Sequence, residues 1–432
     1  VASRQIDRLQ ICVVVRNIVL LMSNEYRNNH YVPEWYQKRF LPKGQKDQEL
    51  FYLDLRPESF IDPRGIPHPR KNPRRLGFGH CFAEEDLYTT KFGSIESTEI
   101  EQHFFGAVDR NGRKAVDYYA NFAYPWDGKD ALHDLVMYMS TQKLRTPKGL
   151  GFLRDKTGSY DKNRVLQIML QLQQLHCAIW AECVWLIADA SKSETKFIIS
   201  DHPVTVYNRR CGPRSHWCRG NDDPDIRFQG THTLFPLSFD KILILTNLSW
   251  VRNPYQSETD LRPNPNPFRS TIFKITDIQT LRHLNEQEVR EINFIIKSRA
   301  LRHIAAAKEE WLYPDRHISK SRWNVYGDGY LLMPDPRPVN LGGEIFWGNN
   351  DGTGGAMDEY GRRPWEKDYG KEGKSLEEAN TLYRFKGEFA RLYGPYRRGR
   401  AFEVTSIDKE YDDDKFHQYH LDLEKKRKRK NG

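Results

Sequence analysis

The chain has 432 residues, of which 38% are apolar, 12% aromatic and 29% charged. This composition excludes a wholly disordered chain, and the length suits two domains or one large domain with extensions. The 67 basic and 58 acidic residues give a net charge of +9, which favours anionic partners but does not specify a fold.

The N-terminal residues 1–25 are predicted to be an extension, and they are an annotation artefact if translation starts at Met22 rather than at Val1. Their apolar stretch is interrupted by Arg16 and lacks the small-residue cleavage site of a secretory signal. No stretch reaches the roughly 20 uninterrupted apolar residues of a membrane span. Six cysteines do not form the dense disulfide framework of small secreted proteins. We therefore expect a cytoplasmic protein without a membrane partner.

Residues 26–312 are predicted to form an α+β domain that is mainly helical around a small sheet, because helical and strand-like apolar patterns are segregated along the chain. The proline-rich, basic stretch 56–79 is expected to be a loop. The predicted helices lie at 33–41, from about residue 94, and at 130–145, 162–180 and 286–311. The predicted strands lie at 50–55, 183–188, 196–199 and 241–248.

Residues 313–432 are predicted to be a separate, partly disordered C-terminal appendage with one helix at 375–393. The appendage ends in a run of like charges, which repel one another and stay in solvent. We expect this run either to bind nucleic acid or another polyanion, or to serve solubility alone. It consists of Lys425, Lys426, Arg427, Lys428, Arg429 and Lys430.

The apolar stripe of the predicted helix 130–145 ends in two polar residues, Gln142 and Arg145, which need partners if they are buried. Arginine has a planar fork that suits a phosphate or a carboxylate. The anion is therefore either a ligand, which would make Arg145 a clamp, or an internal carboxylate, with Asp109 and Asp201 as candidates. For a clamp, we expect Arg145→Lys to impair function even in a folded protein, because an ammonium group cannot make a bidentate contact.

Two further residues carry alternative interpretations. His30 is a candidate general base, phosphate contact or metal ligand, or else a side chain that fixes its turn through backbone hydrogen bonds. Asp201 is a candidate metal ligand or a partner that orients His30, or else a turn residue whose carboxylate accepts hydrogen bonds from backbone N–H groups near Pro203. Because polar groups at the ends of apolar segments need partners, we expect His30, Gln142, Arg145 and Asp201 to converge in space.

Five motifs, taken together and in this order, resemble the bacterial domain of unknown function catalogued as number 4238. The resemblance covers some 280 residues, or two thirds of the chain, and it implies a domain but no activity. Family members usually carry a Glu where Asp109 stands here. The motifs are His30-Tyr31-Val32-Pro33, Asp86-Leu87-Tyr88, Gln142-x-x-Arg145-Thr146-Pro147, Phe197-Ile198-Ile199-Ser200-Asp201-His202-Pro203 and Phe235-Pro236-Leu237-Ser238.

Two functional hypotheses follow from these residues. The first is an enzyme that cleaves phosphodiesters or handles phosphate on a nucleic acid or nucleotide, with a divalent metal as a candidate cofactor. The second is a non-catalytic module that binds nucleic acid or a protein. An open cleft with His30, Arg145 and Asp201 within about 8 Å would favour the enzyme, and a sealed, mutually bonded cluster would favour the module.

A group of zinc-type ligands also occurs in the sequence, at a spacing that matches no standard zinc finger. The group consists of Cys211, His216 and Cys218, with His202 nearby.

Overall fold

The computed structural model describes residues 27–92, 95–122, 129–273, 278–318, 323–328, 330–401 and 414–430. The predictions made for residues 1–25 fall outside this part of the chain. Helices account for 38% and strands for 19%, distributed over several sheets. The mixed α and β composition is therefore confirmed, whereas a mainly helical domain around one small sheet is not.

The largest sheet among the described residues has six strands, and its two central strands are almost wholly buried. Its centre is the antiparallel pair of β9 and β13, in which Val184 lies opposite Thr246 and Asp189 opposite Lys241. The predicted strands at 183–188 and 241–248 are confirmed by this pair. In sheet order the strands are β11 (Thr205–Tyr207), β12 (His232–Pro236), β13 (Lys241–Thr246), β9 (Val184–Asp189), β14 (Gln279–His283) and β18 (Arg400–Ala401).

A second sheet of four strands corrects two of the sequence predictions. The stretch 56–79 is not a loop throughout. Its residues Arg74–Gly77 form β5, which pairs with β2 (Glu49–Asp54), and β3 (Ser59–Ile61) and β4 (Pro67–Pro69) form a separate hairpin. The predicted helix 286–311 stops at Arg299, because residues His303–Ala306 form β15, a strand that pairs with β2. The sheet order is β10 (Ile199–Ser200), β15 (His303–Ala306), β2 (Glu49–Asp54) and β5 (Arg74–Gly77). Small two-stranded sheets join β1 (Asn28–His30) with β6 (Ala83–Glu85), and β7 (Thr90–Phe92) with β8 (Ile95–Ser97).

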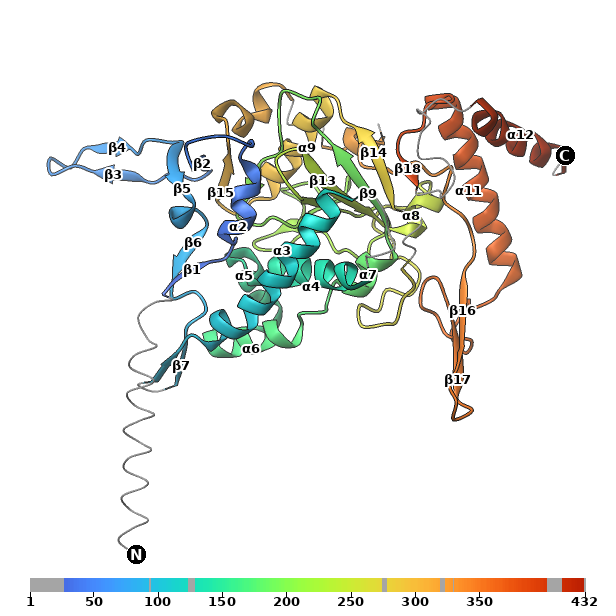
Figure 1. The fold of residues 1–432 in the computed structure, drawn as a ribbon, viewed down its shortest axis with the longest axis horizontal. Coiled ribbons are helices and arrows are strands. Elements are labelled where there is room, and N and C mark those ends of the chain that lie inside the picture. The colour runs from blue at the N-terminus through green and yellow to red at the C-terminus, as the bar shows by residue number, and fades with distance from the viewer. Residues whose placement is uncertain are drawn as a thin grey trace, which may run out of the picture.

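Helices α3 to α7 gather into one group (Figure 1). α4 ends at Arg145, as the Thr-Pro sequence predicts, and Thr146 caps α5 by accepting a hydrogen bond from the backbone of Gly149. The predicted helix 162–180 is split by a turn into α6 and α7. The helices are α2 (Glu34–Gln37), α3 (Gly106–Ala120), α4 (Lys129–Arg145), α5 (Pro147–Thr157), α6 (Lys162–Gln171), α7 (Cys177–Glu182), α8 (Leu248–Arg252), α9 (Glu286–Arg299) and α10 (Val325–Asp328).

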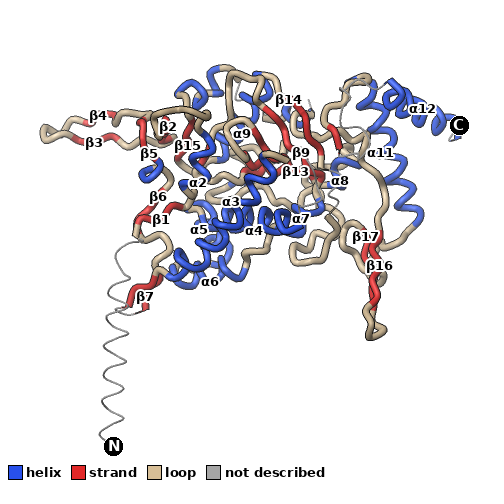
Figure 2. The backbone as a smooth tube through the Cα atoms, viewed as in Figure 1, coloured by secondary structure: helices blue, strands red, loops and turns tan. Residues whose placement is uncertain are grey.

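The segment from about residue 330 onward packs on this body through a second, smaller apolar cluster, to which both parts contribute. α11 (Glu372–Tyr393), which confirms the predicted helix, places Phe385 and Phe389 in one apolar cluster with Leu248 and Val251 of α8. α12 (Asp414–Lys430) lies beside α11, and the β16 (Glu344–Gly348) and β17 (Gly354–Asp358) hairpin projects from the body, as does the β3–β4 hairpin (Figures 1 and 2). A domain division at residue 312 stays a prediction.

No helix in the described ranges combines the length and the apolar character needed to cross a membrane.

Candidate functional site

Arg145 lies in a buried internal ion pair. Its guanidinium donates to both carboxylate oxygens of Asp109, at 2.8 and 3.1 Å, and to Oε1 of Gln142 at 2.5 and 2.8 Å. The Arg145 side chain is only 1% exposed. Burial lowers its pKa, but the carboxylate of Asp109 outweighs burial, so the pKa of Arg145 lies above its usual value. Of the two alternatives, the structure therefore shows the internal pair with Asp109.

The other family-like motifs contact the same region. Gln142 donates to the carbonyl of Tyr31 at 2.6 Å, and the hydroxyl of Tyr88 donates to the carbonyl of Arg145 at 2.9 Å. Thr146 lies 2.7 Å from Nδ1 of His202, which joins the third motif to the fourth. These motifs thus tie separate segments together around the C-terminal end of α4.

His30 and Asp201 have separate surroundings. Nε2 of His30 lies 3.8 Å from Oε1 of Glu34 and has no hydrogen-bond partner among the residues that the structure describes. The buried carboxylate of Asp201 accepts three backbone N–H bonds of 2.6 to 2.9 Å, from residues 301–303 rather than from near Pro203. Within the described ranges, Gln142 and Arg145 come together, and no hydrogen bond or ion pair links their side chains to His30 or Asp201.

An open cleft lies on the other side of the α4–α5 junction. Its volume is about 670 Å³, which is within the range of small-molecule sites. One wall comes from α4, α5 and α7, and the other from residues 216–228 and Pro267. The apolar part of the lining includes Phe152, Ile179, Trp217 and Phe228.

Four polar side chains form a bonded network at the floor of the cleft. Asp223 accepts from Lys148 at 2.5 Å and from Lys143. Nε2 of His202 lies 3.1 Å from the Lys143 ammonium and 3.1 Å from the Asp223 carboxylate. Each of these side chains is about a tenth exposed or less. The network therefore reaches the cleft only through small exposed areas, as is common for catalytic and ligand-binding groups.

Cations outnumber carboxylates at this floor. Lys148 also donates to the carbonyl of Arg299 at 2.9 Å, and Arg299 is itself buried without a carboxylate partner among the described residues. Besides Asp223, the carboxylate of Asp201 acts electrostatically on Lys148. Among the residues that line the cleft, Lys143 and Lys148 share the single carboxylate of Asp223, because Asp222 and Asp225 pair with Lys156 and Arg227. A buried excess of positive charge is costly unless an anion compensates it.

Burial and the neighbouring charges shift the pKa values of this network. Burial, and then the charge of Lys143, lowers the pKa of His202 to about 3, so the imidazole is neutral at pH 7. Burial also lowers the pKa of Lys143. Burial would raise the pKa of Asp223, but Lys143 and Lys148 outweigh it and hold that pKa well below its usual value. The site combines a neutral imidazole, a carboxylate and an ammonium of reduced pKa, which are the groups of acid–base chemistry.

The local sequence explains how the two lysines come together. Pro147 stops α4 and occupies the first turn of α5, so Lys143 and Lys148 lie on either side of a sharp helix–helix corner. A Cβ atom at Gly149 would collide with the carbonyl oxygens of Lys143 and Leu144. Only glycine permits this close approach of α5 to the end of α4.

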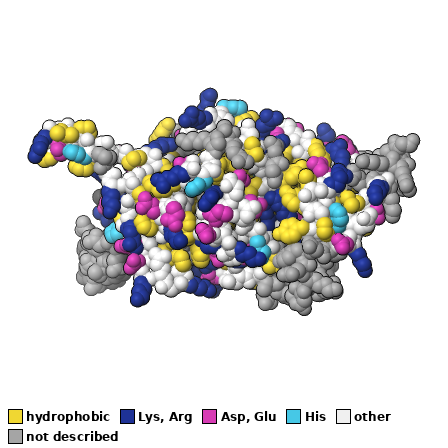
Figure 3. All heavy atoms as spheres, turned by 90° about the horizontal axis from the view of Figure 1, so that it is seen from above, with side chains coloured by type: hydrophobic (Ala, Val, Ile, Leu, Met, Phe, Trp, Pro, Cys, Tyr) yellow, Lys and Arg dark blue, Asp and Glu magenta, His cyan; other side chains and the backbone are white. Residues whose placement is uncertain are grey.

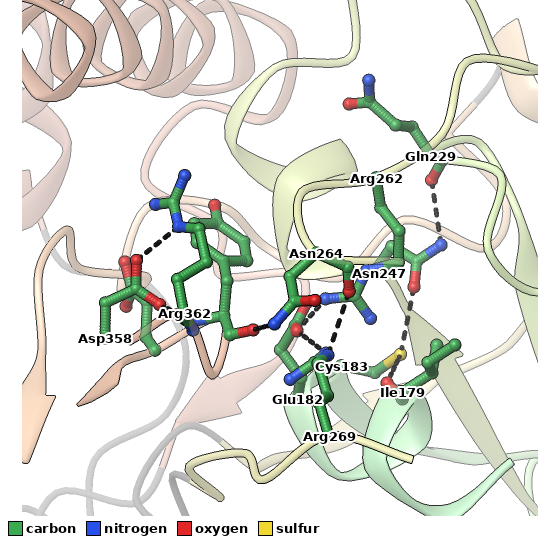
Figure 4. Close-up of polar contacts among 12 residues, drawn as sticks. Ile179, Glu182, Cys183, Gln229, Asn247, Arg262, Asn264, Arg269, Asp358 and Arg362 are labelled. Atoms are coloured by element: carbon green, nitrogen blue, oxygen red, sulfur yellow. Dashed lines mark hydrogen bonds and ion pairs between the residues drawn. The ribbon is translucent and has the colours of Figure 1, made fainter. Parts of the chain in front are cut away.

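The far wall is held by the buried polar network of Figure 4. Asn247 donates to the carbonyl of Gln229 at 3.3 Å (Figure 4). It also donates to the carbonyls of Phe228 at 2.7 Å and Ile226 at 3.3 Å, and both of these residues line the cleft. Arg262 and Arg269 both contact the carboxylate of Glu182 at the end of α7 (Figure 4). These contacts fix the Pro267 loop and the segment 226–228 in place.

The zinc-type residues do not form a metal centre. Cys218 donates to the carbonyl of Cys211 at 3.5 Å, and the ring of His216 packs on Trp217 at the cleft. Among the described residues, no three His, Cys, Asp or Glu side chains are placed to share a metal ion.

The sequence model of a family described as "Protein of unknown function (DUF4238)" matches residues 28–310, which is more than half of the chain. The chain belongs to the DUF4238 family. No curated protein and no solved structure matches it. The matched range contains the Arg145–Asp109 pair and the whole floor of the cleft, so both are features of the DUF4238 domain in this chain.

Sequence reasoning missed Lys143, Lys148 and Asp223, and it treated His202 only as a neighbour of the zinc-type residues. Lys143 lies between Gln142 and Arg145 in the third motif, and His202 lies between Asp201 and Pro203 in the fourth. Asp223 lies in a polar loop, 80 positions after Lys143. The spacing of residues in the sequence gives no signal for a contact between two residues so far apart in the chain.

Proposed function

We propose that the DUF4238 domain is a phosphate-handling enzyme that binds a nucleotide-class ligand in the cleft beside the α4–α5 corner. The observation that carries the proposal is the excess of buried cations over carboxylates at the floor of an open cleft. A phosphate group supplies the missing negative charge, and lysine ammonium groups are common phosphate contacts. The enzyme is expected in the cytoplasm, and the five cysteines of the described ranges are free thiols, as in a reducing compartment.

The lining of the cleft favours a ligand with a flat apolar part as well as an anionic part. Trp217 is 36% exposed in the lining of the cleft, where its ring contacts Phe228 and His216. Aromatic side chains bind nucleobases by stacking. A nucleotide can place its phosphate near Lys143 and Lys148 and its base near Trp217.

The proposed chemistry is hydrolysis of a phosphoester. Lys148 compensates the charge of the phosphate. Water attacks phosphorus and the ester P–O bond breaks, and the ammonium of Lys143, whose pKa is lowered, gives a proton to the leaving oxygen and regains one from the attacking water. Asp223 positions Lys143, and Nε2 of His202 is placed either to donate to Asp223 or to accept from Lys143. The divalent metal expected from the sequence stays a candidate cofactor that the substrate phosphate could carry.

Binding of nucleotides to the purified chain tests this proposal. We expect Lys148→Met to weaken nucleotide binding by about tenfold to a hundredfold, because a hydrogen bond to a charged group contributes about 1.5–3 kcal/mol. Trp217→Ala should also weaken binding without disturbing the ionic network. Calorimetry gives the dissociation constants, and Lys46→Met, at an exposed lysine remote in sequence, is the matched control.

The same experiment separates the enzyme from the non-catalytic module. Release of phosphate or of a cleaved nucleotide, lost in Lys143→Met, supports the enzyme. Binding without turnover favours the module. No nucleotide binding at millimolar concentrations, or equal binding by wild type and both cleft variants, would contradict the cleft proposal.

The basic run at the C-terminus is a separate candidate for polyanion binding. α12 extends through Lys430, and the side chain of Lys425 is exposed. On the described part of the face shown in Figure 3, basic and acidic side chains are interspersed, so that face offers no continuous basic surface. We assign long polyanions to residues 425–430, where six consecutive residues are basic.

Removal of residues 425–432 should leave the melting temperature nearly unchanged, because exposed surface residues contribute within about 0.5 kcal/mol. The truncated chain should bind DNA or RNA more weakly, with a smaller dependence on salt. Affinities at two salt concentrations measure this. Identical affinity and salt slope for both chains would rule out the nucleic-acid role, and a melting temperature lower by more than about 3 °C would show that the run joins the fold.

A further inference from the structure

The β3–β4 hairpin projects from the body as an arm. It lies at the opposite end of the molecule from α12, which carries the basic run at residues 425–430 (Figures 1 and 2). The turn at residues 62–66 closes on itself. The amide of Asp62 donates to the carbonyl of Ile66 at 3.0 Å, and the carboxylate of Asp62 accepts from the amide of Ile66 at 2.9 Å. The turn thus holds its shape through its own hydrogen bonds.

The distal part of the arm exposes apolar side chains on both of its faces. Ile61 is 71% exposed, Ile66 50% and Phe60 45%. Successive residues of a strand point to opposite faces. Phe60 therefore lies on one face, where it stacks on His68, and Ile61 lies on the other face, opposite Pro67. Exposed apolar surface marks a contact with a protein or a membrane, and a flat protein surface would cover only one face of this tip.

The charges of the arm favour a membrane with anionic lipids. Residues 56–75 contain six basic residues and two acidic ones. Both carboxylates have a partner, because Glu58 pairs with Arg302 at 3.0 Å and Asp62 lies 3.1 Å from Nε2 of His68. Anionic headgroups attract basic side chains, while the boundary of the acyl chains covers apolar ones. Five basic side chains of the arm are exposed and, within the described ranges, pair with no carboxylate: Arg56, Arg64, Arg70, Lys71 and Arg74.

We propose that the β3–β4 arm is a membrane-contact site, which inserts its tip into the headgroup layer of a membrane that contains anionic lipids. Phe60, Ile61 and Ile66 all lie in the turn or within two residues of it. At about 3.3 Å per residue, this reach matches the roughly 5–10 Å by which interfacial segments enter a bilayer. A nucleic acid would neutralise the same charges, but it presents a polar, charged surface to most of the apolar tip.

This contact is compatible with a cytoplasmic protein, because the cytoplasmic leaflet is the anionic one. It replaces the expectation of a chain without a membrane partner, which rested on the lack of a spanning segment. The site does not depend on the proposed function of the cleft.

Flotation of the full chain with lipid vesicles tests this inference. The probes are vesicles of phosphatidylcholine alone and vesicles that also contain phosphatidylserine, and we expect the protein to bind the second kind more tightly. Ile61→Ser combined with Ile66→Ser should weaken binding about tenfold or more, at low salt and at about 1 M salt, because burial of apolar surface does not depend on ionic screening. Salt of this strength also screens the attraction between the lipid and residues 425–430. Arg70→Gln combined with Lys71→Gln should weaken binding about twentyfold, only at low salt, because each basic residue near an anionic surface contributes about fivefold.

Matched double variants control for a general loss of apolar or basic residues. Leu376→Ser combined with Leu392→Ser removes two exposed leucines of α11 and should leave vesicle binding unchanged. Arg113→Gln combined with Lys114→Gln removes two exposed basic residues of α3 and should also leave it unchanged. All of these positions are exposed, so each variant should keep the fold, and an unchanged melting temperature verifies this.

Two kinds of result would overturn the inference. The first is that the wild type binds neither kind of vesicle, or binds no better than the variant with both isoleucines replaced. The second comes from duplex DNA as a competing probe. DNA binding that Arg70→Gln with Lys71→Gln weakens, in a protein that does not bind vesicles, would assign the arm to nucleic acid instead.

Discussion

Arg145→Met is expected to lower the free energy of unfolding by about 3 kcal/mol or more. The substitution leaves the Asp109 carboxylate and the Gln142 carbonyl without their donor, and breaking a buried pair from one side costs about 3–5 kcal/mol. The guanidinium also packs over the rings of Phe105 at 5.1 Å and Tyr138 at 5.8 Å. Denaturant titration measures the change.

Two further variants separate the ion pair from the rest of the side chain. Arg110→Met, at an exposed neighbour of Asp109 on α3, should change stability by less than about 0.5 kcal/mol. The double variant Arg145→Met with Asp109→Leu should recover part of the loss, because no carboxylate is then left unpaired. Wild-type stability of Arg145→Met would show that the pair is not structural. The functional defect expected for Arg145→Lys stays a prediction. Because Arg145 pairs with Asp109, we expect this defect to come from a disturbed fold rather than from a lost ligand contact.

The second large effect is a loss of stability in mild acid. Burial is the main reason that the pKa values of His176, His202 and His232 are each lowered to about 3, from 6.5. Because the folded-state pKa is the lower one, the unfolded chain binds more protons between about pH 6.5 and pH 3, and stability falls as the pH falls through this window. Each histidine contributes roughly 2 kcal/mol of loss between pH 7 and pH 5.

His232 offers a test of this pH effect outside the cleft. Its Nδ1 lies 2.9 Å from the hydroxyl of Thr246 in the six-stranded sheet. The His232→Gln variant should lose about 2 kcal/mol less than the wild type between pH 7 and pH 5, although its stability at pH 7 is lower. Denaturant titrations at the two pH values give both numbers. Equal stability of the wild-type protein at pH 7 and pH 5 would contradict neutral buried histidines.

Local sequence signals predicted those elements whose boundaries are set locally. The apolar stripe of α4 and the Thr146-Pro147 stop are both readable from the chain, and α4 ends where they indicate. The apolar runs of β9 and β13 were equally clear, since both strands are buried in the sheet. Each of these signals comes from residues that are close together in the sequence.

Boundaries set by distant pairing were not predictable in this way. The alanine-rich segment after Arg299 suits a helix, yet it pairs as β15 with β2, some 250 residues earlier in the chain. The proline-rich stretch 56–79 suits a loop, yet Arg74–Gly77 completes the edge of the same sheet. The cleft has the same origin, because Asp223 meets Lys143 and Lys148 only in the folded chain.

The location of a bound nucleotide tests the central claim most directly. A crystal structure of the protein with a nucleotide, or with a non-hydrolysable analogue, shows which side chains contact the phosphate. The account predicts the phosphate within hydrogen-bonding distance of Lys143 or Lys148, with the base against Trp217 and the Arg145–Asp109 pair intact. A phosphate bound to Arg145 with the Asp109 pair broken, or a nucleotide bound outside the cleft, would contradict it.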